Sequence, residues 1–234
     1  MKFERPLVDG VLIKRYKRFL ADVKLVETGE IILAHVPNSG SMLGVSDSGS
    51  SCRVSISDVI TRKIPYTLEM VKTPSGEWVG VNTSLTNKLV REAFEKKKIS
   101  DWKKFVSIQG EVKINKESRL DFLLSNGTKK RFVEVKNVSM AKPPWAVFPD
   151  AVTLRGQKHL YDLMKLAKKG DEAEIFFVVQ RQDCKLFKPC DEIDPEYGRL
   201  LRKCIKQKVI IRCWACAINS ENIELHHELE VDLS

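Results

Sequence analysis

The sequence of 234 residues lacks the features that mark membrane-spanning, exported and repetitive proteins. No run approaches the roughly 18 uninterrupted apolar residues of a membrane-spanning helix. The first six residues, MKFERP, are charged and contain no apolar core of the kind found in a signal peptide. Internal repeats and low-complexity tracts are absent as well. We therefore expect a globular protein of the cytoplasm, without a membrane partner, built from one large domain or two small ones.

Cysteine is scarce, and its distribution gives no reason to expect a disulfide framework. There are six cysteines in the chain, and a reducing cytoplasm disfavours disulfide bonds. Cys213 and Cys216 have the spacing of a zinc or redox pair, but no second such pair exists. They fall in residues 209–218, a segment typical of a buried strand, on which side chains three apart point to opposite faces. We expect two core thiols rather than a zinc site.

What the sequence does have is an excess of positive charge. Lys and Arg number 40 against 31 Asp and Glu, which gives a formal net charge of +9 and a pI near 9.2. Nucleic acid is the commonest polyanionic partner of a cytoplasmic protein with this balance. The alternative is a solvated, lysine-rich surface without a specific partner.

Residues 1–82 carry the pattern of a small β-barrel. Short β-rich segments occur at residues 11–25, 30–36, 51–59, 66–71 and 78–82. Thr73-Pro74-Ser75-Gly76, between the last two segments, is typical of a hairpin turn. About five short strands in so short a length favour an OB-like barrel, a fold that binds nucleic acids.

A basic and aromatic run, KRYKRF at residues 14–19, lies in the first of these segments. On a strand its even-numbered members share one face and its odd-numbered members the other. OB barrels bind nucleic-acid strands with basic side chains on phosphates and aromatic rings on bases, although one face can instead pack into the barrel. The residues expected to contact nucleic acid are Arg15, Tyr16, Lys17 and Arg18.

Residues 83–234 alternate between helical and strand patterns. Helices are expected at residues 85–98, 153–169 and 195–207, and strands at 105–114, 119–125, 130–138, 174–180 and 209–218, with 223–231 at a sheet edge. Asn82, Thr83 or Ser84 can cap the first helix, and Gly170 suits the end of the second. The Asn126-Gly127 pair predicts a tight hairpin between the second and third strands. We therefore expect an α/β domain, and an α+β organisation for the chain overall.

Two acidic residues and a lysine stand out on that hairpin. Glu134 and Lys136 are two apart on one strand and so share a face, and the hairpin brings Asp121 beside them. Two neighbouring carboxylates repel each other unless a cation uses them. Mg²⁺ or Mn²⁺ suits such a site, with Asp121 and Glu134 as ligands and Lys136 stabilising charge on a phosphate. The alternative is a surface hairpin with weak salt bridges.

This order of helix, three strands, helix and strand resembles the core of the PD-(D/E)XK nuclease superfamily. That resemblance implies catalytic roles for Asp121, Glu134 and Lys136, and it assigns Gln157, four residues before Tyr161, a place near the attacking water. An amphipathic helix with these polar residues outside is the alternative. The superfamily also uses a further acidic metal ligand. We prefer Glu111 on the first strand, with Glu92 on the preceding helix as the other candidate. Arg119, Arg155 and Lys158 are expected to contact phosphates.

Several segments together resemble the sugar fermentation stimulation protein A (SfsA) family over nearly the whole chain. They are LIKRYKRFLADV at residues 12–23, HVPNSG at 35–40, VNT at 81–83, SRLDF at 118–122, VEVK at 133–136 and FPDAVTLRGQKHL at 148–160. The resemblance implies an N-terminal OB-like domain, a nuclease-like C-terminal domain, sequence-tolerant DNA binding and a link to regulation of sugar metabolism. The cysteines near the C-terminus are not part of it.

These observations support two functional hypotheses from different classes. One is a Mg²⁺- or Mn²⁺-dependent nuclease acting on DNA, and the other is a non-catalytic DNA-binding regulator on a nuclease-like scaffold. The intact set of two acids and a lysine favours the first, because a protein that only binds gains nothing from anionic groups facing phosphate. The sequence does not decide whether the nucleic acid is single-stranded DNA, double-stranded DNA or RNA. It also leaves open whether the protein is a homodimer.

Overall fold

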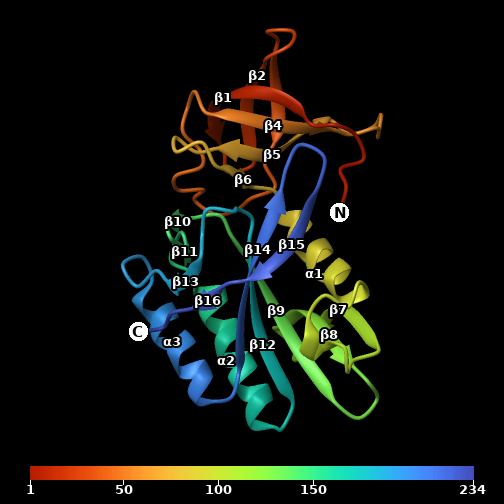
Figure 1. The fold of residues 1–234 in the computed structure, drawn as a ribbon, viewed down its shortest axis with the longest axis vertical. Helices are drawn as coiled ribbons and strands as arrows, with labels where there is room; N and C mark the ends of the chain where they lie inside the picture. The colour runs from red at the N-terminus through yellow and green to blue at the C-terminus, as the bar shows by residue number, and fades with distance from the viewer.

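The computed structural model describes residues 1–234, which form a β-barrel stacked on a larger α/β body. Figure 1 shows the barrel, in red and orange, above the α/β body in yellow to blue. No helix is long and apolar enough to cross a membrane. The predicted fold class is confirmed for both parts of the chain.

The barrel closes on itself through five strands. The order β3-β2-β1-β4-β5 is completed by a parallel pairing of β3 with β5, at Ala34 opposite Tyr66 and His35 opposite Thr67. Apolar side chains alternate along the strands and fill the interior, as Leu12, Val23 and Leu68 do. The strands are β1 (Val8–Tyr16), β2 (Leu20–Leu25), β3 (Ile31–His35), β4 (Ser51–Ile56) and β5 (Tyr66–Lys72), with a short β6 (Trp78–Gly80) paired to β5.

The β-rich segment at residues 11–25 is two strands rather than one. The chain reverses between β1 and β2, where Lys17 and Arg18 have left-handed backbone angles, with φ values of 48° and 62°. The two-residue alternation of the basic run therefore ends at Tyr16. The expectation that Arg18 shares a strand face with Tyr16 is wrong, because both Lys17 and Arg18 lie in the turn.

The α/β body is built on a six-stranded mixed sheet in the order β15-β14-β12-β9-β8-β7. β12 runs parallel to both β9 and β14, and the remaining neighbours are antiparallel. The Asn-Gly turn joins β8 to β9 as predicted, and Gly127 takes the left-handed backbone with φ 88°. The strands are β7 (Ser107–Lys113), β8 (Arg119–Ser125), β9 (Lys130–Val138), β12 (Glu172–Val179), β14 (Ile210–Ile218) and β15 (Ile223–Glu228).

Three helices cover the two faces of this sheet. α1 (Thr86–Glu95) packs Leu89 and Val90 on one face, in a core shared with Phe176. α2 (Leu154–Lys168) and α3 (Pro195–Lys206) cover the other face. Thr153 caps α2 through a hydrogen bond from the Gly156 amide, and Asp194 caps α3 through one from Tyr197. The central strands of the sheet are thus buried between α1 on one face and α2 and α3 on the other.

The two cysteines of the Cys-x-x-Cys pair lie on opposite faces of this sheet, as predicted. Cys213 belongs to the core beneath α2 and α3, and Cys216 to the core beneath α1. Burial raises the pKa of the Cys216 thiol well above its usual value. Both residues act as core packing, in agreement with the interpretation made from the strand pattern.

A second, small sheet was missed by the sequence patterns. It consists of β10 (Ala141–Lys142), β11 (Trp145–Phe148), β13 (Leu186–Pro189) and β16 (Glu230–Val231). These strands are too short to show a two-residue period, and prolines punctuate them. The small sheet gathers segments far apart in the sequence beside α2 and α3 (Figure 1).

The start of the chain contacts the α/β body, and Arg5 pairs with Asp58, just after β4 of the barrel. The terminal ammonium of Met1 donates to Glu92 of α1 and to the carbonyl of Ile223, and Phe3 donates to the carbonyl of Glu221. At the other junction, Gly80 donates to the carbonyl of Gln180. These contacts tie the barrel to the sheet at both ends of its chain segment, and a domain boundary after residue 82 stays a prediction.

A buried charge cluster stabilises the end of the sheet away from the barrel. The Glu174 side chain is fully buried, and its carboxylate accepts hydrogen bonds from Trp102 Nε1 (3.0 Å), Arg131 Nη1 (2.9 Å) and Arg212 Nε (2.8 Å). Asp101 bridges the same two guanidinium groups. A buried charge is tolerated only when it is paired in this way.

We predict that Glu174→Ala lowers the free energy of unfolding by about 3–5 kcal/mol, because it leaves two guanidinium groups without their buried partner. Urea unfolding at neutral pH measures the change. The control is Glu196→Ala, which removes an exposed ion pair to Arg199 and should cost less than about 1 kcal/mol. Equal losses in the two variants would show that the buried cluster does not stabilise the sheet.

Candidate metal and nucleic-acid site

The site begins where β8 and β9 stop pairing with each other. Their antiparallel ladder extends up to the pair Phe122 and Val133, and Asp121 is the next residue on β8. Asp121 Oδ2 accepts a hydrogen bond from the Val135 amide (2.8 Å), and Oδ1 accepts one from Asn87 Nδ2 on α1 (2.8 Å). The side chain thus occupies the position where the backbone ladder would have continued, and both of its oxygens are held in place.

Glu134 faces the other helical layer and carries a cationic partner. Its side chain is almost fully buried, and Oε1 accepts from Lys136 Nζ at 2.6 Å. His159 of α2 contacts the same oxygen through Nδ1, and Lys136 Nζ lies 3.3 Å from that nitrogen. Lys136 and Glu134 share a face of the strand, as their spacing predicts.

The ionisation of Asp121 depends on Glu134. Burial raises the pKa of Asp121 to about 6, and the negative charge of Glu134 adds to the rise; the Val135 amide, Asn87 and Lys136 only partly offset it. Burial also acts to raise the pKa of Glu134, but Lys136 and His159 outweigh it, so this pKa lies below its usual value. The ionised form of Asp121 is therefore the unfavourable one of the pair at neutral pH.

The third acidic ligand is not brought to this pair. No three His, Cys, Asp or Glu side chains are grouped closely enough to hold an ion. Glu111 has a left-handed backbone (φ 53°), is mostly exposed, and has its carboxylate 3.6 Å from Arg119. Glu92 is bound to the Met1 ammonium and to Lys96. Both glutamates border a cavity of about 300 Å³ that Asp121 also lines, so the choice between them stays a prediction.

Gln157 is engaged elsewhere. Its amide donates to both carboxylate oxygens of Asp194, at 2.9 and 3.1 Å, and so ties α2 to the cap of α3. Tyr161 lies on the same side of α2, with its hydroxyl 3.5 Å from Glu196. The expectation that Gln157 orients water at the carboxylates is not supported by any of its hydrogen bonds, because the start of α3 takes up its amide.

His159 is the residue of the site that sequence reasoning missed. No sequence pattern assigned it to the site, yet it touches both Glu134 and Lys136. A signal for this role exists, since residues i, i+1 and i+4 of a helix lie on one side. His159 shares its side of α2 with Leu160 and Leu163, which face the sheet. A histidine facing a strand that carries Glu134 has a carboxylate within reach.

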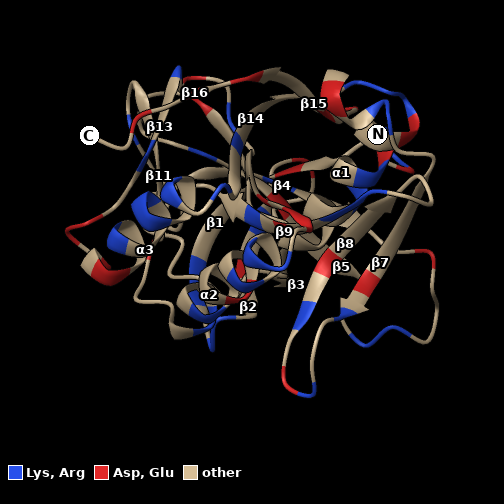
Figure 2. Cartoon of the chain, turned by 90° about the horizontal axis from the view of Figure 1, so that it is seen from below, with Lys and Arg blue, Asp and Glu red and all other residues tan.

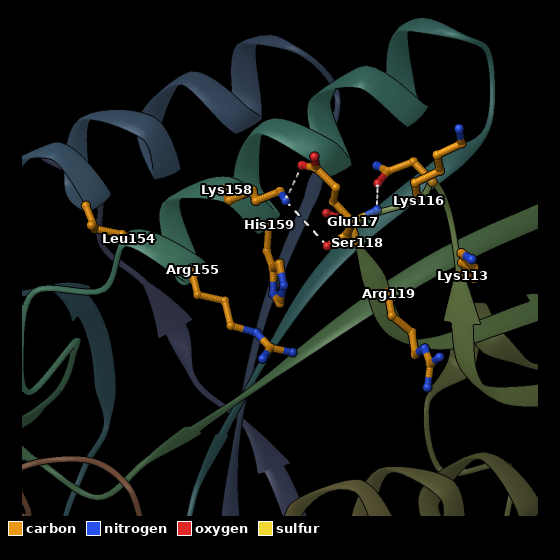
Figure 3. A pocket seen from close by; sticks show the side chains of 10 residues that line it. Lys113, Lys116, Glu117, Ser118, Arg119, Leu154, Arg155, Lys158 and His159 are labelled. Atoms are coloured by element: carbon orange, nitrogen blue, oxygen red, sulfur yellow. Dashed lines mark hydrogen bonds and ion pairs between the residues drawn. The ribbon is translucent and has the colours of Figure 1, made fainter.

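A basic cavity of about 550 Å³ opens next to His159, between α2 and the loop that joins β7 to β8 (Figure 3). The predicted phosphate contacts Arg119, Arg155 and Lys158 all line it. Figure 2 shows further Lys and Arg along α2. The other lining residues are Lys113, Asn115, Lys116, Glu117, Ser118 and Leu154. The predicted phosphate-binding side chains come from two separate segments of the sequence and line the same cavity.

The predicted contacts on the barrel have different surroundings. Arg15 is occupied by the loop that follows β3, because its guanidinium donates to the carbonyls of Asn38, Gly40 and Ser41 at 2.9–3.0 Å. Its Nε also donates to the carbonyl of Arg18. Arg15 therefore braces a loop in this structure, which leaves little of it for a phosphate, whereas the neighbouring turn residues Lys17 and Arg18 are exposed.

Tyr16 is also partly engaged. Its hydroxyl donates to Asp22 Oδ1 at 3.0 Å on the neighbouring strand, and this hydrogen bond raises the pKa of the phenol. The ring is half-buried, which leaves part of it available for stacking on a base. The barrel thus offers Tyr16 beside the basic turn.

Comparisons with known proteins agree with this two-part architecture. Residues 13–81 match the model described as the SfsA N-terminal OB domain, and residues 84–222 match that of the sugar fermentation stimulation protein RE domain. Sugar fermentation stimulation protein homologs are similar over nearly their whole length. The one from Bdellovibrio bacteriovorus is 46% identical (96% of this chain, 96% of the relative), and that from Geotalea daltonii is 48% identical (97% and 98%).

A solved structure shows the same fold. SfsA of Pyrococcus furiosus, in complex with Ca²⁺, is 27% identical and superposes with a TM-score of 0.89 over 99% of this chain and 98% of that one. The two matched family models together span most of the sequence, in the order barrel then α/β body. The chain belongs to the sugar fermentation stimulation protein family.

Proposed function

We propose that this protein binds DNA and hydrolyses its phosphodiester bonds with a divalent cation held by Asp121 and Glu134. The observation that carries the proposal is Asp121 itself, a partly buried carboxylate whose pKa burial and the charge of Glu134 raise to about 6. An arrangement of two carboxylates that burial and repulsion disfavour calls for a positive partner. We place this activity in the cytoplasm. RNA is the alternative substrate.

The donor set fits Mg²⁺ or Mn²⁺. Both residues offer carboxylate oxygens, and Mg²⁺ is commonly held by one or two carboxylates while water and substrate phosphates complete its shell. The absence of a third protein ligand is compatible with such a site. The Ca²⁺ complex of the Pyrococcus protein supports a divalent ion in this fold. Bound there, the cation supplies charge stabilisation on a phosphate oxygen and a more acidic water.

The chain's own residues have separate tasks in this proposal. The Lys136 ammonium has three N–H groups, and one of them donates to Glu134. The other N–H groups can donate to a phosphate oxygen or to the attacking water. His159 fixes the position of the Glu134 carboxylate from the side of α2. Asn87 and the Val135 amide fix Asp121 from the other side. Preorganised groups of this kind need not rearrange during reaction.

A specific observation favours the second candidate, a DNA-binding regulator without catalysis. Glu134 is paired with Lys136 and contacted by His159, and Asp121 already has a hydrogen bond on each oxygen. The hydrogen bonds of this site are thus complete without a cation, even though the pKa of Asp121 stays raised. The two candidates differ in whether added Mn²⁺ changes the DNA.

We predict that the parent protein cuts DNA in Mn²⁺ and not in EDTA, and that Glu134→Gln and Lys136→Ala lower the cleavage rate by a factor on the order of 10²–10³. DNA binding should survive in both, and tighten in Glu134→Gln, because a negative charge near phosphate is gone. Labelled single-stranded DNA, double-stranded DNA and RNA are the substrates. Glu196→Gln, on the exposed part of α3, is the matched control and should cut normally.

If the purified parent cuts none of these substrates, the regulator is the correct candidate. If both site variants cut like the parent, the activity belongs to another site or another protein.

We further predict that Asp121→Asn stabilises the protein in EDTA at pH 7.5 by up to about 3 kcal/mol. The folded pKa of Asp121 is about 6, above the unfolded value of 3.8, so the folded state loses stability as the pH rises through that interval. The penalty is complete above pH 6 and absent below pH 4. Asparagine carries no charge and avoids it, so the gain should vanish near pH 4. Denaturant unfolding at both pH values measures it.

Adding Mn²⁺ to the same unfolding experiment distinguishes loss of a metal ligand from a general effect of removing a charge. The cation should raise the unfolding temperature of the parent and not that of Asp121→Asn, because it binds only the folded site. Asp9→Asn, which loses an exposed ion pair to Arg53, should respond to Mn²⁺ like the parent. If Asp121→Asn is less stable than the parent at pH 7.5, and Mn²⁺ raises the unfolding temperature of both equally, Asp121 is not a ligand of the cation.

The two arginines near the barrel turn should behave differently. Arg18→Ala should flatten the dependence of log DNA affinity on log salt by about one phosphate contact, a slope change near 0.7–0.9, without lowering the unfolding temperature. Arg15→Ala should lower stability by about 1–3 kcal/mol, because it frees the loop carbonyls that the guanidinium holds. An unchanged slope in Arg18→Ala, measured by fluorescence anisotropy at several salt concentrations, would contradict a role of the turn in DNA binding.

A further inference from the structure

The basic cavity beside α2 has a charge pattern that the carboxylate pair does not require. Its lining is almost entirely polar, with a single hydrophobic residue, Leu154. Cationic side chains come from both of its walls, and the one acidic side chain, Glu117, is mostly exposed and turned to Lys158. The five cations are Lys113, Lys116, Arg119, Arg155 and Lys158. Such a space attracts a group with more than one negative charge.

One side of the cavity is closed by contacts between its walls. Lys158 Nζ donates to the backbone carbonyl of Glu117 (3.4 Å) and to its carboxylate (3.2 Å), which bridges α2 and the β7–β8 loop. Behind the bridge, Ser118 Oγ donates to the buried Asp162 at 2.6 Å. Figure 3 shows Arg155 and Arg119 extending from the two walls on the side away from the bridge. The two arginines thus flank the side of the cavity opposite the bridge.

The cavity is connected to the carboxylate pair through one side chain. His159 lines the cavity and also contacts Glu134 and Lys136. It is almost fully buried, so it forms part of the floor and not of the rim. A nucleic-acid strand whose end lies in the cavity therefore has its following phosphates on the side of the proposed cleavage site.

We propose that this cavity binds the terminal phosphate monoester of a nucleic-acid strand. A monoester carries a charge of about −1.5 to −2 at neutral pH, more than the single charge of each internal phosphodiester. The forked guanidinium groups of Arg119 and Arg155 suit its oxygens, since arginine binds phosphate through paired N–H donors. The inference rests on the proposed function only for the position of the following phosphates. It makes the substrate a strand end and not the interior of a duplex.

Binding of short oligonucleotides in EDTA tests this without cleavage. Single-stranded DNA of one sequence is prepared with a 5′-phosphate, with a 3′-phosphate, and with hydroxyl groups at both ends, each with an internal fluorophore. Fluorescence anisotropy should show one phosphorylated form binding about tenfold more tightly than the unphosphorylated one. The polarity of the bound strand follows from whether the 5′-phosphate or the 3′-phosphate oligonucleotide binds more tightly. Inorganic phosphate should abolish the difference by competition.

Variants assign the preference to the cavity. Arg155→Ala and Arg119→Ala should each reduce the preference severalfold, and Arg155→Lys should keep part of it. Lys168→Ala, exposed at the other end of α2, is the matched control with the same loss of charge and should bind like the parent. Equal binding of all three oligonucleotides by the parent, or an unchanged preference in both arginine variants of normal thermal stability, would overturn the inference.

The result is independent of the cleavage assay. A phosphate preference in a protein that never cuts DNA would retain the cavity and reject the nuclease, whereas cleavage without a preference would retain the nuclease and reject the cavity.

Discussion

The hydrogen bond from the Val135 amide to Asp121 Oδ2 is the contact on which the candidate site depends. It takes the place of the next rung of the β8–β9 ladder and so brings a charged side chain to the point where the strands part. Once the strands part there, Asn87 of α1 reaches Asp121 from one helical layer, while His159 of α2 reaches Glu134 from the other. The site is assembled where both helical layers meet the same gap in the sheet.

This arrangement is unfavourable for the carboxylates, and the molecule compensates on only one of them. Lys136 pairs with Glu134, whereas Asp121 receives only hydrogen bonds and keeps a raised pKa. The buried Glu174 cluster at the other end of the sheet differs in its ionic partners, because two arginines contact one central carboxylate there, although burial still raises the pKa of Glu174. A carboxylate without an ionic partner that lines a cavity is typical of a functional site, whereas one enclosed by arginines in the core is typical of a structural one.

The sequence predicted the parts of the fold that have long, regular patterns. The strands at residues 119–125 and 130–138 begin and end as predicted, because an Asn-Gly turn and alternating apolar residues define them. The small sheet could not be predicted, since its strands are two to four residues long and pair with segments far away in the chain. The turn at Lys17 was hidden because nothing in the run KRYKRF is a usual turn residue.

At the site, local spacing was informative and distant partners were not. That Glu134 and Lys136 share a face follows from a period of two, which is a local property. The partners of Gln157 and Arg15 are set by tertiary packing: Asp194 caps another helix, and the carbonyls bound by Arg15 belong to a loop more than twenty residues further along the chain. Residue type alone could not distinguish a bracing arginine from one free to bind phosphate.

The most direct test of the account is the position of a divalent cation in a crystal of the protein grown with Mn²⁺ and a short oligonucleotide. Anomalous scattering locates manganese without reference to any assumed mechanism. The account predicts a peak bound to carboxylate oxygens of both Asp121 and Glu134, at about 2.0–2.2 Å, with a phosphate oxygen in the same shell. Manganese bound elsewhere, with Glu134 still paired to Lys136 and His159 in the presence of DNA, would contradict it.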